Sequence, residues 1–404
     1  MSFSFSFDID AAELDDQLDL SSLNLAQSPS ALDEEPIAST SSILHATVPL
    51  SELLATLPPL LSYTPVHVPL SSPSSEPITL LRRDLFDARF QILNQDEDPD
   101  RQAAAAASND KGKLKEVTEG EEQQFIDESS DLVKGVYEGG LKTWECSLDL
   151  VDCLAERGYS PVRDPETERV RGKSVLEVGC GTAVPSCAIF ARLLNEIRQS
   201  PTREGQTPKQ ETRIHLQDYN KQVLSLITLP NLLLTYAHHV IVTRAAADSP
   251  NPIKVTDSDE STPVPQFKGP GELDVTPEFL ESFESLLSHE RISLEFSCGD
   301  WSGFSETVRS NGGEGRFDVV LTSETVYSLP SLPSLLDLLE KASKEDSLCL
   351  VACKRIYFGV GGGELEFRKR VEQRGGKVES VWGQGSGKGR DEGVGRTVLK
   401  VEWK

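Results

Sequence analysis

The sequence lacks the features that would send a protein into a membrane or out of the cell. No lysine or arginine precedes Arg82, which removes the charged start of a secretory signal and the arginine-rich face of a mitochondrial presequence. No run approaches the roughly 18 apolar residues that span a bilayer. The seven cysteines form no CxxC pair and lie mostly in apolar stretches, a pattern typical of buried thiols in a reducing compartment. We therefore expect a soluble intracellular protein with no membrane partner.

Positive charge is scarce as well. Asp and Glu total 65 against 40 Lys and Arg, a net charge of −25. Residues 1–130 hold 24 acidic and 7 basic side chains, so 17 of the 25 excess negative charges lie there. A nucleic-acid surface needs clustered cations to neutralise phosphates, so we expect no direct binding to nucleic acid. A basic protein is the partner that this charge favours.

Composition divides the chain into parts. Only 37% of the 404 residues are hydrophobic, which indicates that some of the chain lies outside any packed core. The predicted parts are a disordered acidic tail (1–42), an N-terminal extension packed on the larger domain (43–93), a linker (94–122) and an α/β domain (123–404) with polar insertions at 199–211 and 247–272.

Strand and helix patterns alternate from about Leu132 onward. Lys173–Val178 is typical of a buried parallel strand, and Val184–Ile197 has apolar residues at helical spacing. Further strands are expected at Arg213–Gln217, Ile292–Cys298, Phe317–Thr322 and Ser347–Ala352, helices at Lys221–Thr235, Leu332–Ala342 and Glu364–Arg374, and a closing antiparallel pair at Lys377–Val381 and Thr397–Trp403. This alternation predicts a doubly wound, Rossmann-like open sheet.

A glycine turn follows the first of these strands. Gly179 and Gly181 allow the backbone to turn sharply and approach a ligand at the start of a helix. A dinucleotide fingerprint would need a third glycine where Val184 stands, so close pyrophosphate binding is poorly supported. Glu177, two positions before the first glycine, is suited to hold a ligand ammonium beneath the turn. A plain tight turn is the alternative.

Polar residues also end the next strands of the predicted sheet. Asp218-Tyr219-Asn220 follows the second strand, where a carboxylate reaches the ribose hydroxyls of a nucleoside cofactor; an Asx cap for the next helix is the alternative. Gly299-Asp300-Trp301 ends the third, where an acidic side chain or a backbone group can address an adenine amine and tryptophan can cover the ring. A tryptophan at a strand end is more often plain packing. Ser323 and Glu324 end the fourth, at the edge where such sheets do their chemistry. Alternatively, Glu324 stabilises a helix dipole.

The ordered segments YEGGLKTWEC, VLEVGCG, HLQDYN, CGDW, LTSETVY and KRIYFGVGGG resemble the protein-histidine N-methyltransferase family. These are seven-strand enzymes that modify a histidine of large-subunit ribosomal protein three. The resemblance runs from about Pro65 to the C-terminus and implies S-adenosylmethionine as the cofactor, with that basic ribosomal protein as the partner. We also expect a monomer in the cytoplasm and nucleus. The implied cofactor contacts are Thr143, Trp144, Glu145, Cys146, Ser147, Gly179, Asp218, Tyr219, Asn220, Gly299, Asp300, Trp301 and Ser323.

A neutral imidazole, with a pKa near about 6.5, has a free lone pair and needs no strong base before it attacks a methyl donor. We expect Glu324 or a nearby acceptor to hold the imidazole N–H, while Tyr327 and Tyr357 position the ring. Two alternatives stay open. The spacing Glu324-x-x-Tyr327 also fits a lysine methyltransferase of the same superfamily, and an acidic chain fits a non-catalytic assembly factor for a ribosomal protein. The six histidines show no ligand spacing, so no metal is expected.

Overall fold

The computed structural model describes residues 43–72, 77–96, 132–133, 137–138, 140–161, 169–202, 208–247, 269–358, 361–383 and 395–403. The predicted tail (1–42) lies outside these residues. So do most of the predicted linker and the middle parts of the two predicted insertions.

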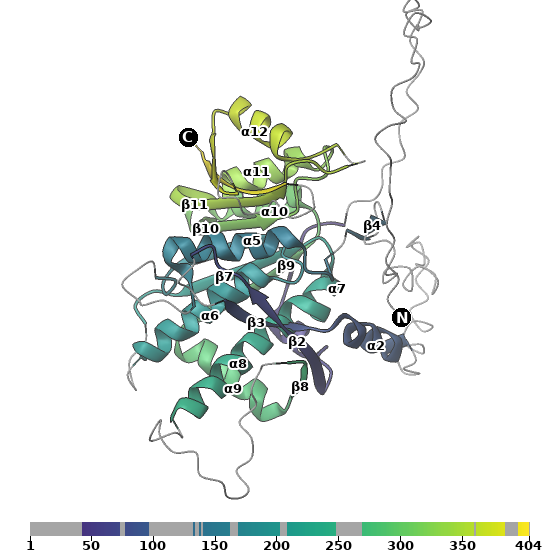
Figure 1. Cartoon of the computed structure of the whole chain (residues 1–404), viewed down its shortest axis with the longest axis vertical. Coiled ribbons are helices and arrows are strands. Elements are labelled where there is room, and N and C mark those ends of the chain that lie inside the picture. The colour runs from purple at the N-terminus through teal and green to yellow at the C-terminus, as the bar shows by residue number, and fades with distance from the viewer. Residues whose placement is uncertain are drawn as a thin grey trace, which may run out of the picture. The chain divides into compact units, whose positions relative to one another are not determined.

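An eight-stranded sheet forms the centre of the described chain (Figure 1). In spatial order its strands are β1 (Ala46–Val48), β9 (Ile292–Cys298), β7 (Thr212–Asp218), β6 (Ser174–Val178), β10 (Phe317–Ser323), β11 (Ser343–Lys354), β13 (Arg396–Glu402) and β12 (Lys377–Trp382). The strands from β9 to β11 are parallel, and β13 is antiparallel to both β11 and β12. The predicted α/β sheet and its closing antiparallel pair are confirmed. One further strand, β1, pairs antiparallel with β9 at the opposite edge.

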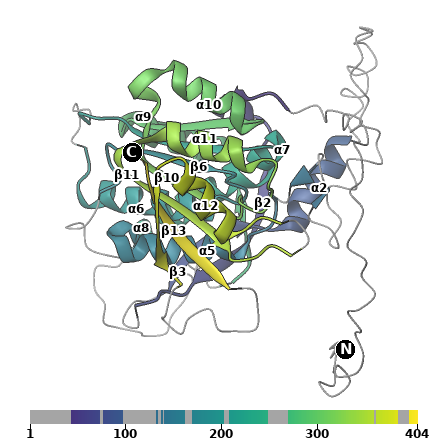
Figure 2. The same ribbon diagram turned by 90° about the horizontal axis from the view of Figure 1, so that it is seen from above.

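Helices cover both faces of this sheet, and each face has its own hydrophobic core. The helices of the first face are α5 (Glu145–Leu154), α6 (Val184–Gln199), α8 (Leu229–Ala247) and α9 (Pro277–His289), and those of the second are α10 (Trp301–Ser310), α11 (Leu332–Ala342) and α12 (Glu364–Gln373). Successive strand residues point to opposite faces, so Val175 of β6 joins the first core and Leu176 the second. Figure 2 shows α6 and α8 on one side of the sheet and α10 and α11 on the other.

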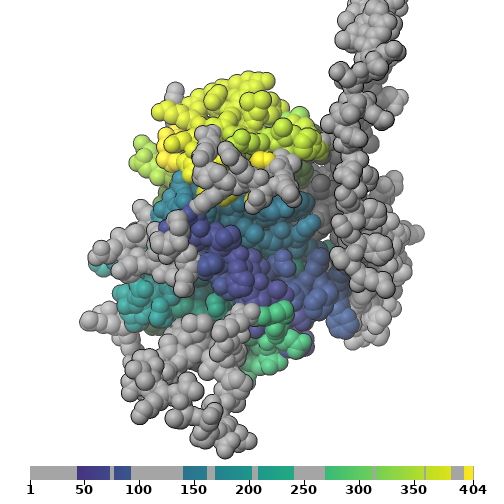
Figure 3. Space-filling model, viewed as in Figure 1, coloured from purple at the N-terminus to yellow at the C-terminus, as the bar shows by residue number. Residues whose placement is uncertain are grey.

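Residues 43–96 form strands that the sequence did not predict. β2 (Leu60–Val68) lies between β3 (Ile78–Arg83) and β8 (Gly271–Asp274) in a second, three-stranded sheet. The short helix α1 (Leu50–Leu54) contacts β9 of the main sheet, and α2 (Leu85–Asp96) follows β3 in the chain. Figure 3 shows this segment, in purple to blue, lying against the larger body. Arg83 links the two: its N–H donates to Asn231 Oδ1 and its guanidinium to the carbonyl of Leu226, both at 2.8 Å.

The predicted helix Lys221–Thr235 is longer than expected and contains a π-helical turn. It comprises α7 (Lys221–Val223), η3 (Leu224–Thr228) and then α8. By length and composition Lys221–Val240 could cross a membrane, but 78% of the apolar window is buried inside the protein. That burial is typical of the core helix of a globular domain.

The short elements are β4 (Leu132–Val133), β5 (Tyr137–Glu138), the π-helical turn η2 (Ala155–Tyr159) and the 3-10 turn η4 (Gly312–Gly315). All seven cysteines are buried free thiols, which confirms the prediction from their apolar surroundings.

Candidate active site

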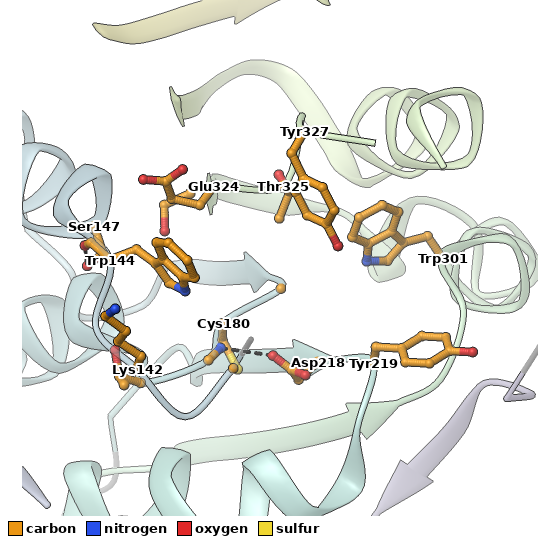
Figure 4. Close-up of a pocket in the computed structure, with 15 residues that line it drawn as sticks. Lys142, Trp144, Ser147, Cys180, Asp218, Tyr219, Trp301, Glu324, Thr325 and Tyr327 are labelled. Carbon is orange, nitrogen blue, oxygen red and sulfur yellow. Dashed lines mark hydrogen bonds between the residues drawn. The ribbon is translucent and has the colours of Figure 1, made fainter. Parts of the chain in front are cut away.

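A pocket opens at the carboxyl ends of β6, β7 and β10, where the sheet edge was predicted to carry chemistry. It is lined by Gly140, Lys142, Trp144, Ser147, Gly179, Cys180, Gly181, Thr182, Asp218, Tyr219, Trp301, Ser323, Glu324, Thr325 and Tyr327. Figure 4 shows Trp144 and Trp301 on opposite sides of it. Cys180 and Asp218 lie along one edge, and Glu324, Thr325 and Tyr327 along the other.

The glycine turn between β6 and α6 forms one wall. Gly179 and Gly181 have φ of 62° and 50°, in the left-handed region that favours glycine. A Cβ on Gly179 would lie 2.7 Å from Thr325 Cγ2, and one on Gly181 would lie 3.1 Å from the carbonyl oxygen of Gly140. Side chains at these two positions would therefore strain the turn and press it against the opposite wall.

Asp218, at the end of β7, holds this turn in place. Its carboxylate accepts from the N–H of Gly181 at 2.9 Å (Figure 4). It also accepts from the N–H of Asn220 at 3.1 Å. Asn220 stands at the N-cap of α7, but its side chain makes no capping hydrogen bond and does not line the pocket. Asn220 therefore does not supply the predicted cap, and the carboxylate of Asp218 accepts from the N–H of this N-cap residue itself.

Gln217 is a positioning residue that the sequence did not single out. It is fully buried in β7, and its amide oxygen accepts from the indole N–H of Trp301 at 3.0 Å and from the N–H of Gly179 at 3.2 Å. Its amide nitrogen donates to the carbonyl of Gly299 at 2.9 Å. One side chain thus ties the glycine turn, the tryptophan wall and the loop after β9 together. Its strand, TRIHLQD, holds several polar residues, so the sequence gives no signal that sets Gln217 apart.

Several predicted contact residues do not line the pocket. Asp300 caps α10, where its carboxylate accepts from the N–H of Gly303 at 2.8 Å. Its contact with a base stays a prediction. Gly299 lies against the backbone of Leu44. The other predicted residues absent from the lining are Thr143, Glu145, Cys146, Glu177 and Tyr357.

Glu177 is buried below the turn, where it was predicted to hold a ligand ammonium. Its carboxylate instead accepts from the N–H of Ser186, in the first turn of α6, at 2.9 Å. Burial raises its pKa to about 8, against a smaller lowering by the Ser186 hydrogen bonds. The carboxyl is therefore mostly protonated in the folded protein at neutral pH.

This shift predicts a pH-dependent stability. Because the folded pKa exceeds the unfolded value, the contribution of Glu177 is full below about pH 4.5 and is lost as pH rises through 8. As pH rises from about 5 to 8.5, the unmodified protein should lose about 4 kcal/mol of unfolding free energy through ionisation of Glu177. Glutamine does not ionise, so Glu177→Gln should not show this loss. Urea denaturation at both pH values measures it, with exposed Glu284→Gln as the control. Equal pH dependence in all three proteins would contradict the shift.

Glu324 follows β10 and adopts a left-handed conformation, with φ of 56°. Non-glycine residues rarely do so, and such strain clusters at functional sites. Tyr357 donates its hydroxyl proton to Glu324 Oε2 at 2.6 Å, and its own oxygen accepts from the N–H of Lys354 at 3.2 Å. Burial and the carboxylate of Glu324 raise the pKa of Tyr357 well above its usual range, so the phenol stays protonated as a donor.

The second carboxylate oxygen, Glu324 Oε1, is buried and makes no hydrogen bond to the described residues. It lies 3.6 Å from the ammonium of Lys354. The ring of Tyr327 lies 6.3 Å from that of Tyr357, tilted by 60°. The predicted trio Glu324, Tyr327 and Tyr357 is thus brought together, with Tyr357 behind the carboxylate that lines the pocket.

No group of three or more His, Cys, Asp or Glu within the described ranges could hold a metal ion.

Known proteins resemble this chain over most of its length. No model of a protein family matches. Histidine protein methyltransferase 1 of Schizosaccharomyces pombe is 33% identical over 315 residues, which cover 78% of this chain and 75% of that protein. The protein of the same name in Saccharomyces cerevisiae is 31% identical over 300 residues, 73% of this chain and 69% of its own. A homologue in Bos taurus is 29% identical and covers 68% and 58%.

Solved structures align more weakly. The magnesium protoporphyrin IX methyltransferase of Synechocystis, solved with bound SAM, is 9% identical, with 64% of this chain and 78% of that chain covered at a TM-score of 0.30. The ribosomal protein L11 methylase of Lactobacillus delbrueckii is also 9% identical, with 69% and 91% covered at a TM-score of 0.30. Superpositions at this level are too loose to establish a shared function.

Proposed function

This chain belongs to the histidine protein methyltransferase family, and from that premise we propose that it transfers the methyl group of S-adenosylmethionine to a histidine imidazole of large-subunit ribosomal protein three. The observation that carries the chemistry is the buried Glu324 carboxylate at the pocket wall, with one oxygen held by Tyr357.

The pocket residues fit the cofactor. The left-handed turn at Gly179 and Gly181 presents backbone to the pocket, and a Cβ at either glycine would press against Thr325 or Gly140. Asp218 is suited to accept from ribose hydroxyls, and the Trp301 ring, fixed by Gln217, is suited to cover an adenine. When bound, S-adenosylmethionine supplies a methyl group already activated by its sulfonium charge.

The residues around Glu324 suit a neutral imidazole acceptor. Near neutral pH most imidazole, with a pKa near about 6.5, has one N–H and one free lone pair. In this proposal Glu324 Oε1 accepts the N–H, which fixes the tautomer and directs the other nitrogen toward the methyl group. Tyr357 holds the carboxylate, and Tyr327, whose ring lies near that of Tyr357, is suited to pack against the imidazole. No strong base is needed before attack.

Charge supports the choice of a basic protein substrate. The chain carries a net charge of −25, and long-range attraction between opposite charges speeds encounter. Free buried thiols suit a reducing compartment, so we extend the proposal to action in the cytoplasm and nucleus. We also propose a monomer.

The test is a product analysis. The full chain is incubated with tritiated S-adenosylmethionine and purified large-subunit ribosomal protein three, and the hydrolysed product is separated into amino acids. We expect methylhistidine. Methyllysine alone would support the lysine alternative, and absence of both, with intact binding of S-adenosylhomocysteine, would overturn the proposed substrate.

A further inference from the structure

Lys354, the last residue of β11, lies between two carboxylates beside the pocket. Its ammonium is 3.6 Å from Glu324 Oε1 and 3.5 Å from Glu145 Oε2. Parallel pairing of β10 with β11 brings it there, because Ser323 is opposite Ala352 and the N–H of Glu324 donates to the carbonyl of Ala352. The contact is therefore built into the sheet.

The same ammonium also faces aromatic walls of the site. It lies 5.0 Å from the centre of the Trp144 ring and 6.0 Å from that of Tyr357. A second ammonium, that of Lys142, lies 5.3 Å from the Trp144 ring. Trp144 and Glu324 both line the pocket, so the wall around them carries positive as well as negative charge.

The two carboxylates differ in how far solvent screens them. The side chain of Glu324 is 8% exposed and that of Glu145 is 59% exposed. Water weakens the field of the exposed carboxylate much more than that of the buried one. Inside the pocket wall, therefore, the interaction that matters is between Glu324 and Lys354, and these two charges offset each other.

This pairing affects lysine and histidine substrates in opposite ways. An unpaired buried carboxylate would attract the ammonium of a lysine, which has a pKa near about 10.4 and is cationic at neutral pH. With Lys354 in contact, an incoming ammonium meets a like charge at the same oxygen. A neutral imidazole N–H meets no such repulsion and still finds an acceptor.

We propose that Lys354 is a specificity-determining residue that excludes the lysine ammonium and leaves Glu324 available to a neutral imidazole. The inference rests on the proposed histidine methyl transfer and deepens it. It also explains how a chain with the spacing Glu324-x-x-Tyr327 can prefer histidine, although lysine methyltransferases have a similar acidic and aromatic pair.

Binding of small probes tests this without a protein substrate. N-acetyl-histidinamide and N-acetyl-lysinamide are titrated at about pH 8 into the full chain saturated with S-adenosylhomocysteine, and affinities are taken from NMR line broadening. The unmodified protein should bind the histidine probe at least about 10-fold more tightly. In Lys354→Met the ratio should fall to about 1 or 2.

Two variants separate charge from packing. Lys354→Arg keeps the positive charge and should keep the preference. Lys369→Met removes an exposed lysine of α12 and should also keep it. A purely structural role for Lys354 predicts weaker binding of both probes with an unchanged ratio, and that result would overturn the inference, as would a ratio near 1 in the unmodified protein.

Methylation of the ribosomal protein is a separate readout. If the unmodified protein prefers the histidine probe and Lys354→Met loses that preference, while neither methylates the ribosomal protein, the proposed substrate fails and the role of Lys354 stands. If methylhistidine forms but the probe ratio is the same in both proteins, the proposed substrate stands and the role of Lys354 fails.

Discussion

Replacing Asp218 with alanine should lower the affinity for S-adenosylhomocysteine by about 100-fold, roughly 2.7 kcal/mol. The carboxylate accepts from the N–H of Gly181 and from that of Asn220, so its removal leaves two donors unpaired and loosens the turn that forms the pocket wall. It also removes the proposed acceptor for the ribose hydroxyls, and hydrogen bonds to a charged group contribute about 1.5–3 kcal/mol each. Isothermal titration calorimetry measures the change.

Two further variants separate the causes. Asp218→Asn keeps an oxygen that can accept from Gly181 and should lose only about 10-fold in affinity. Asp274→Ala removes an exposed carboxylate of β8 and should bind normally. An affinity for Asp218→Ala within about threefold of the unmodified protein, with the fold intact by circular dichroism, would rule out the ribose contact.

The main sheet could be predicted because its signals are local. Each central strand is followed by glycine or ends at a polar residue, and parallel strands bring such ends to one edge. For that reason Gly179, Asp218 and Ser323, 144 positions apart from first to last, were expected together and do line one pocket.

The N-terminal strands were not predicted, and one of them, β2, contains Pro65. The strand β2 accommodates it: β8 pairs only with Leu60–Tyr63, while the pairing of Pro65 is with Leu81 of β3. Proline has no N–H to donate, so a strand tolerates it where one side of the strand has no hydrogen-bonding partner. Within the described residues, β2 has no partner strand on the β8 side at Pro65.

Side-chain partners were the least predictable part of the site. The capping role of Asp300 was not predicted; it arises because a carboxylate just before a helix finds the first free N–H groups nearby. Gln217 and Lys354 act through contacts that depend on the spacing between neighbouring strands. Neither residue type nor spacing along the chain reveals such contacts.

Glu324→Gln should lower the rate of histidine methylation by about 100-fold, while the affinity for S-adenosylhomocysteine stays within about twofold. The substitution removes the charge that strengthens acceptance of the imidazole N–H, and it weakens the hydrogen bond from Tyr357. It also introduces an amide NH₂ that can hold the ring in the wrong tautomer. Positioning of a reacting nitrogen contributes strongly to rate, so loss of tautomer control should appear mainly in kcat.

The tautomer argument has a second consequence that a loss of stability would not imitate. With Glu324 present, one imidazole nitrogen is held and the other is methylated, so a single methylhistidine isomer should form. In Glu324→Gln the residual product should contain both isomers, which chromatography of the hydrolysed substrate separates. Glu345→Gln, an exposed position on β11, should retain full rate and a single isomer.

Because Tyr357 acts through the carboxylate, Tyr357→Phe should loosen Glu324 and produce a milder version of the same mixture. Unchanged rate and isomer purity in Glu324→Gln would remove Glu324 from the mechanism.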